Sequence, residues 1–97
     1  MSKFVVLMTL TQDGARDIKN APRRVDDAVK LFESMGGKLL GLYLVMGDYD
    51  YIAIGEAPDD QVAAAFVMAL ASFGNVRTKT LKAFDMEEMA AVIKKIP

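Results

Sequence analysis

Residues 39–56, with the sequence LLGLYLVMGDYDYIAIGE, contain two apolar runs that are typical of β-strands. The runs cover Leu39 to Met46 and Tyr49 to Glu56, and only Gly47-Asp48 separates them. Glycine at the first position of a two-residue loop suits a type II′ turn, because that position requires a positive φ. The sequence therefore predicts an antiparallel β-hairpin with Gly47-Asp48 as its loop.

The alternation of side chains along this hairpin assigns its two faces. The predicted turn pairs Val45 with Asp50 and Tyr43 with Ile52, which places these side chains and Ile54 on one face. The opposite face carries Leu40, Leu42, Leu44, Tyr51, Ala53 and Gly55. This second face has small residues that let helices approach closely, so we expect a helix layer there and the Tyr43/Asp50 face inside a barrel.

The rest of the chain supplies two more strands and three helices. Apolar spacing and helix-capping residues define their limits. The expected elements are a strand at 4–11, a helix capped by Asn20 and stopped by Gly36-Gly37, a helix opened by 57–60 with its body at Val62 to Ala71, a strand at 76–84, and a last helix opened by a capping box at Asp85 to Glu88.

The element order βαββαβ with an added C-terminal helix is that of a ferredoxin-like α+β domain. Right-handed crossovers then give a four-stranded antiparallel sheet with strand order 4-1-3-2. In this topology Thr11 with the 12–20 loop, the 47–50 turn, and residues 75–77 meet at one end of the sheet. With 97 residues, the chain is expected to be a single domain over 1–97.

Composition excludes several classes of function. The chain has 12 basic and 13 acidic residues and a net charge of −1, so it lacks the basic surplus expected of a nucleic-acid-binding protein. Cysteine and histidine are absent, which removes thiolate nucleophiles and imidazole ligands, and we expect no cofactor and no metal site. The longest uncharged segment, Gln61 to Val76, is too short to span a membrane. We therefore expect a cytoplasmic protein.

The apolar content predicts self-association. Hydrophobic residues make up 53% of the chain, whereas about 45–50% is typical of globular domains. Much of the surplus lies in the helix body Val62 to Ala71, which carries no charge on any face. Because a helix that is apolar all round is normally covered all round, either the last helix covers it or it lies between subunits. We expect at least a homodimer.

Several spaced motifs identify a family resemblance. They are Gly47-Asp48-Tyr49-Asp50, Glu56-Ala57-Pro58-Asp59-Asp60, Gly74-Asn75-Val76-Arg77-Thr78, and Ala83-Phe84 before an acidic helix start. Together they resemble the GYD family of small bacterial and archaeal proteins, over nearly the whole chain. The resemblance implies a ferredoxin-like chain of the dimeric α/β-barrel type, in which two sheets pack face to face. It implies a fold and an assembly rather than a reaction.

The candidate site lies at the end of the sheet where these segments meet. Thr11, Tyr43, Asp50 and Arg77 are expected near the mouth of a mostly apolar cavity, with Tyr49 at its edge, as in a small-molecule site. Asp50 would accept a proton there or hold a ligand hydroxyl or amine. Alternatively, Asp50 pairs with Arg77 or Lys19, or bonds to hairpin and loop amides, and only fixes this edge.

Two functions fit these residues, and a third reading is a purely structural assembly protein with a dry barrel. The first is a homo-oligomeric small-molecule binding or sensing module without catalysis. The alternative is a cofactor-independent oxygenase or isomerase that acts on a small aromatic or enolisable substrate, by analogy with other dimeric α/β-barrel proteins. In that enzyme Asp50 would be the base, with Tyr43 or Arg77 as its electrostatic partner.

Overall fold

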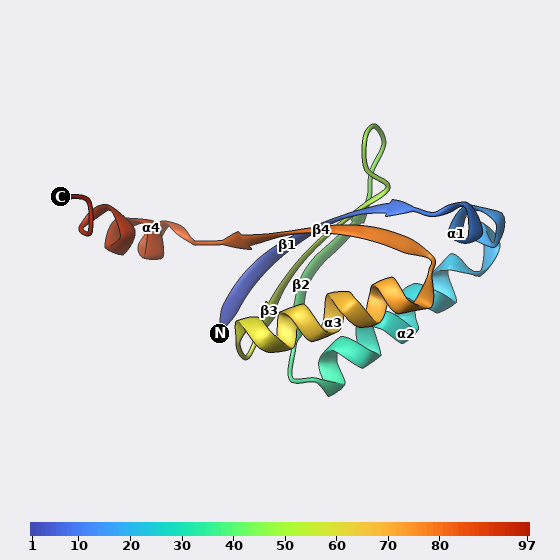
Figure 1. Ribbon diagram of the computed structural model, residues 1–97, viewed down its shortest axis with the longest axis horizontal. Helices are drawn as coiled ribbons and strands as arrows, with labels where there is room; N and C mark the ends of the chain where they lie inside the picture. The colour runs from blue at the N-terminus through green and yellow to red at the C-terminus, as the bar shows by residue number, and fades with distance from the viewer.

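The computed structural model describes residues 1–97 and contains a four-stranded antiparallel sheet with two long helices on one face (Figure 1). Its elements are β1 (Ser2–Leu10), α1 (Gln12–Arg16), the 3₁₀ turn η1 (Ile18–Asn20), α2 (Ala21–Ser34), β2 (Lys38–Leu44), β3 (Tyr51–Ala57), α3 (Asp60–Phe73), β4 (Val76–Ala83) and α4 (Met86–Ile93). The strand order is β2-β3-β1-β4. This confirms the predicted ferredoxin-like α+β fold with an added C-terminal helix. None of the helices has the length and apolar character needed to cross a membrane.

The helix layer packs on the face that carries the small residues of β3. The ring of Phe32 on α2 covers Gly55, where an added Cβ would lie 3.1 Å from a ring carbon. The same ring lies 4.7 Å, centroid to centroid, from the ring of Phe66 on α3. Phe32 also forms the buried core with Ala57 and Ala63. The small residues predicted to admit a helix layer therefore do so.

A β-bulge in β2 changes the face of one predicted residue. The pairing with β3 shifts by one position between Leu39, which faces Gly55, and Gly41, which faces Ile54. A bulge inserts one extra residue and reverses the alternation beyond it. Leu40 is consequently 43% exposed, whereas Leu39 contacts the helix side of the sheet. The assignment of Leu40 to the helix face was wrong.

The β2–β3 connection is longer than a two-residue turn. The pairing of Tyr43 with Ile52 is as predicted, and the Val45 amide donates to the Asp50 carbonyl at 2.9 Å. Residues 45–50 nevertheless lie outside both strands, and Gly47 takes a φ of +112°. The Asp50 amide bonds to the Met8 carbonyl of β1 and not to β2. The ladder between β2 and β3 therefore ends before residue 47. The predicted register is confirmed and the predicted loop length was wrong.

Helix capping also differs from expectation at one position. Asn20 makes no side-chain capping bond, because its amide donates to the Asp17 carboxylate at 2.6 Å. The expected loop at 12–20 instead contains α1 and η1. The capping box of α4 is present as predicted, between Asp85 and Glu88.

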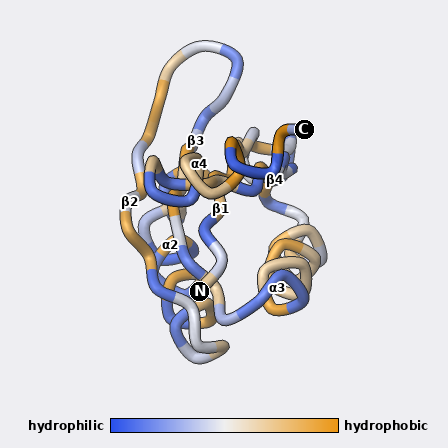
Figure 2. The backbone as a smooth tube through the Cα atoms, turned by 90° about the vertical axis from the view of Figure 1, so that its left-hand side faces the viewer, coloured by the Kyte–Doolittle hydropathy of each residue, from blue (hydrophilic) through white to orange (hydrophobic).

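The last helix projects away from the body of the molecule instead of folding back on α3 (Figure 1). The outward side of α3 is therefore exposed at Ala64, Ala65, Met68 and Ala71. The face of the sheet opposite α2 and α3 carries no helix, and the 45–50 loop rises on that side (Figure 2). Only 8 of the 97 residues are buried, so much apolar surface lies open on the single chain.

Candidate functional site

Thr11 ties the end of β1 to the segment that precedes β4. Its amide donates to the Asn75 carbonyl at 3.0 Å, and its hydroxyl donates to the Gly74 carbonyl at 2.6 Å. The same hydroxyl oxygen accepts the Gly14 amide at 3.1 Å and caps α1. The predicted meeting of these segments at one end of the sheet is thus present. We call this end the rim, defined by residues 11–14, 45–50 and 74–79.

Gly14 is the point of closest approach within the rim. It is fully buried, and an added Cβ would overlap the Asn75 carbonyl oxygen. Only a residue without a side chain fits between α1 and the start of β4 at this distance. The backbone of the rim is therefore held rigidly on this side.

Asp50 fixes the other side of the rim through three hydrogen bonds. Its carboxylate Oδ2 accepts the Leu10 amide at 2.8 Å, and its own amide donates to the Met8 carbonyl at 2.9 Å. Its carbonyl accepts the Val45 amide at 2.9 Å. Asp50 forms no ion pair with Arg77 or Lys19. Of the roles weighed for this residue, the geometry matches bonding to loop and strand amides.

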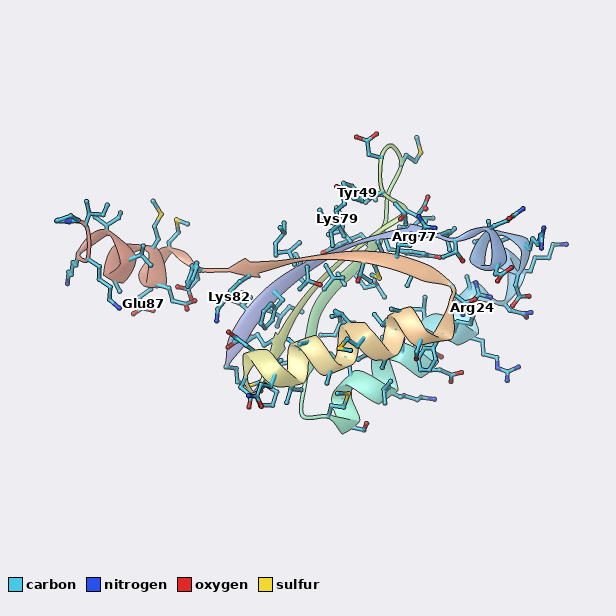
Figure 3. All side chains as sticks on the ribbon, in the orientation of Figure 1. Arg24, Tyr49, Arg77, Lys79, Lys82 and Glu87 are labelled. Carbon is cyan, nitrogen blue, oxygen red and sulfur yellow. The ribbon has the colours of Figure 1, made fainter.

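A basic and aromatic cluster lies on the side of the rim that faces away from α2 and α3, which we call the bare side because no helix covers it. Lys79 Nζ lies 5.7 Å from the centroid of the Tyr49 ring, a cation–π distance. Arg77 lies two residues earlier on β4, opposite Thr9, and therefore on the same face as Lys79. Figure 3 shows Tyr49, Lys79 and Arg77 near the base of the hairpin. Neither basic side chain has a carboxylate partner within the chain.

Lys79 was not among the predicted site residues, although its two-residue spacing from Arg77 was a usable signal.

Tyr43 lies on β2 at the edge of the sheet, 59% exposed and opposite Ile52. The five predicted residues thus share one end of the sheet in two groups. Thr11 and Asp50 use their polar atoms to hold the backbone, whereas Tyr43, Tyr49 and Arg77 face outward.

An apolar, partly open pocket lies between the helices and the sheet, on the side opposite the predicted barrel interior. It is a cavity of about 150 Å³, and 19 of its 23 lining residues are hydrophobic. The polar residues at its wall include Arg24, Asn75 and Thr80. Arg24 is held by the Asp17 carboxylate at 2.7 Å and by the Gly14 carbonyl at 3.2 Å. An apolar cavity of this size suits a small apolar group.

No set of three or more carboxylates gathers in a way that could hold a metal ion. Asp60 lies at the start of α3, near the end of β4 that is far from the rim. Hydrogen bonds from Lys82 Nζ, at 2.8 and 3.0 Å, and from Ser2 hold the pKa of Asp60 below its usual value. This ion pair joins α3 to β4 and lies far from the rim cluster (Figure 3).

Comparison with models of known families shows to which family the chain belongs. The GYD domain model matches residues 4–93. The chain belongs to the GYD domain family. A relative of this GYD domain in Thermus thermophilus, the glutamine synthetase and cystathionine beta-lyase binding protein, is 36% identical over 95 residues, which are 97% of this chain and 100% of the relative.

Solved structures share the fold of this GYD domain at low sequence identity. The leucine response regulatory protein LrpA of Mycobacterium tuberculosis is 18% identical with a TM-score of 0.57, over 88% of this chain and 51% of LrpA. A hypothetical protein of Pyrococcus horikoshii is also 18% identical with a TM-score of 0.57, over 88% of this chain and 92% of its own. These likenesses concern the fold alone.

Proposed function

We propose that this GYD domain is a non-catalytic binding module that forms a homodimer and docks on a metabolic enzyme. The observation that carries the proposal is the outward side of α3. That side consists of the exposed residues Ala64, Ala65, Met68 and Ala71 and contains no charged group. Met68 is 71% exposed. Uncharged patches of this kind on a folded domain mark surfaces for other proteins.

A second copy is the proposed occupant of the bare face of the sheet. By the alternation along β1 and β4, that face carries Val5, Leu7 and Leu81, with Ile52 and Ile54 of β3 opposite them. A two-fold axis would bring the same patch of each chain together. Sheet pairing of this kind would leave the outward side of α3 free, because α3 lies on the other face of the sheet.

The relative in Thermus thermophilus suggests which proteins to test. Its name describes binding to glutamine synthetase and cystathionine beta-lyase. We propose that the present chain binds an enzyme of the same kind through α3. The role of Asp50 in holding β1 favours a binding function over the alternative of catalysis with Asp50 as base.

The proposal is tested by measuring binding to purified glutamine synthetase and cystathionine beta-lyase from the organism that encodes this chain, by biolayer interferometry. We expect saturable binding to at least one enzyme and a loss of at least about tenfold in affinity for Met68→Glu, because a charge would enter a desolvated contact. Ile18→Glu is the matched control, since Ile18 is an exposed apolar residue, 45% exposed, outside α3. Binding to neither enzyme, or equal binding by Met68→Glu and wild type, would contradict the proposal.

The apolar cavity supports a second candidate function, the binding or sensing of a small molecule. Its size is that of one aromatic ring or a short branched chain. Benzene and indole are suitable probes, and a bound probe raises the melting temperature in proportion to its occupancy. Absence of any shift at probe concentrations up to their solubility would remove this candidate and leave the enzyme-docking proposal untouched.

A further inference from the structure

We propose that α4 docks on the rim of a second copy of the chain and completes the cluster of Tyr49, Arg77 and Lys79 in trans. The inference rests on the homodimer of the proposed function. It adds a specific contact that sheet pairing alone does not require.

Helix α4 has no partner within its own chain. Every residue from Phe84 to Pro97 is exposed, and α4 itself is 8 residues long. An isolated helix of that length is unstable in water even with good capping. The Asp85/Glu88 capping box sets where the helix begins, but packing against another surface must supply its stability.

The surface of α4 has an apolar side and an acidic beginning. Met86, Met89, Ile93 and Ile96 recur at helical spacing, and their exposed fractions are 73%, 47%, 50% and 69%. Glu87 and Glu88 lie in the first turn. The occupant of this surface must therefore offer apolar side chains together with positive charge.

The rim offers both properties. Met46, on the 45–50 hairpin that rises from the face of the sheet without helices, is 97% exposed. Arg77 and Lys79 lie on the same side without carboxylate partners. The β4 side of the rim, with Arg77 and Lys79, thus matches the acidic first turn of α4 in charge, and Met46 offers an apolar side chain. The carboxylates of the rim, on Asp13, Asp48 and Asp50, lie outside β4. Within one chain the two surfaces cannot meet, because Glu87 and Arg77 lie at opposite ends of β4 (Figure 3).

Charge also selects the orientation of the two chains. Two bare sheets can pair about an axis parallel to the strands or about an axis perpendicular to them. The parallel axis would bring the Arg77 ends of both chains together and the Glu87 ends together, which is repulsive. The perpendicular axis brings the end of one β4 over the start of the other. This orientation places α4 of each chain beside the hairpin and Arg77 of its partner.

The contact is tested by reversing the charges of Glu87 and Arg77, singly and together. Glu87→Arg and Arg77→Glu should each weaken dimer affinity, measured by analytical ultracentrifugation, by about tenfold, because each places like charges together. The double variant should recover most of the loss. Glu33→Arg, an exposed change on α2, is the control and should leave the affinity unchanged. Additive losses in the double variant would overturn the inference.

Cross-linking gives a second and independent readout, since the chain contains no cysteine. Met46→Cys and Met86→Cys proteins, mixed and oxidised, should form a covalent dimer that neither protein forms alone. Met46→Cys mixed with Ser34→Cys is the control. If the wild type is a stable dimer and the mixed cysteine variants form no such cross-link, the α4 contact is refuted while the homodimer stands. A monomeric wild-type chain would refute the contact together with the homodimer, and the enzyme-binding measurement would still be decided separately.

Discussion

The Leu10 amide donates a 2.8 Å hydrogen bond to Oδ2 of Asp50, forty residues later in the chain. Leu10 is the last residue of β1, and the hairpin leaves the sheet beside it. A side-chain carboxylate therefore takes the place of the strand carbonyl that would otherwise bond to this amide. The rim depends on this contact and on the Thr11 contacts across β1.

Removal of the Asp50 carboxylate should destabilise the chain. We expect Asp50→Ala to lower the free energy of unfolding by about 1–3 kcal/mol, because the partly buried Leu10 amide would lose its acceptor. Asp50→Asn keeps a side-chain oxygen as acceptor, so it should lower the free energy of unfolding less than Asp50→Ala does. Urea denaturation measures both, with Asp48→Ala as the control at an exposed position of the same loop. Equal stability of Asp50→Ala and wild type would show that the bond contributes nothing.

A methyl group at Gly14 should also destabilise the chain, although alanine favours helices. The added Cβ would overlap the Asn75 carbonyl oxygen, so α1 or the start of β4 must shift. We expect Gly14→Ala to lower the free energy of unfolding by about 1–3 kcal/mol. Thermal unfolding measures the effect, and Gln12→Ala, in the first turn of the same helix, is the control. A gain in melting temperature for Gly14→Ala, as intrinsic propensity alone predicts, would contradict the close approach.

Filling the apolar cavity should stabilise the chain and displace small probes. Ala28 of α2 lines the cavity, and Ala28→Leu should raise the free energy of unfolding by about 0.5–2 kcal/mol. The same variant should abolish the melting-temperature shift caused by benzene. Ala64→Leu, on the exposed side of α3, controls for helix propensity. A benzene shift that persists in Ala28→Leu would place the probe elsewhere.

The ion pair between Asp60 and Lys82 should stabilise the fold to an extent that depends on pH. Because the pKa of Asp60 is lowered in the folded chain, chiefly by the Lys82 hydrogen bond, the ionised carboxylate stabilises the fold. This stabilisation is complete above the usual value of 3.8 and is lost as the pH falls through the lowered folded pKa. Asp60→Asn should therefore differ from wild type above pH 3.8 and converge with it as the pH falls below the lowered folded pKa. Asp26→Asn, an exposed change on α2 that leaves the Asp60–Lys82 pair intact, is the control for the general effect of removing one carboxylate.

Local patterns predicted the elements and their order, because turn glycines, capping boxes and apolar spacing act over a few residues. The register of Tyr43 with Ile52 followed from Gly47 alone, and the start of α4 followed from Asp85 and Glu88. The bulge at Leu40 and the length of the hairpin were not predictable in this way. Both depend on contacts with distant parts of the chain, such as the bond from the Asp50 amide to β1.

The gathering of the candidate residues at one end of the sheet was predicted, and the contacts that each residue makes there were not. Topology alone brings Thr11, the hairpin and Arg77 to one end of the sheet. Whether a carboxylate there binds a ligand or an amide depends on which backbone groups lack partners, and only the structure gives that information. The cavity between the helices and the sheet has no local signature either, because it arises from the spacing of whole layers.

The proposal that the bare sheet face pairs with a second copy is tested most directly by multi-angle light scattering of the wild-type chain at micromolar concentration. The account predicts at least a dimer, with a mass about twice the 10.6 kDa of the chain. Leu7→Glu, which places a charge on the bare face, should shift this mass toward the monomer, and Ala64→Glu on α3 should not. A wild-type mass of 10.6 kDa would contradict the account.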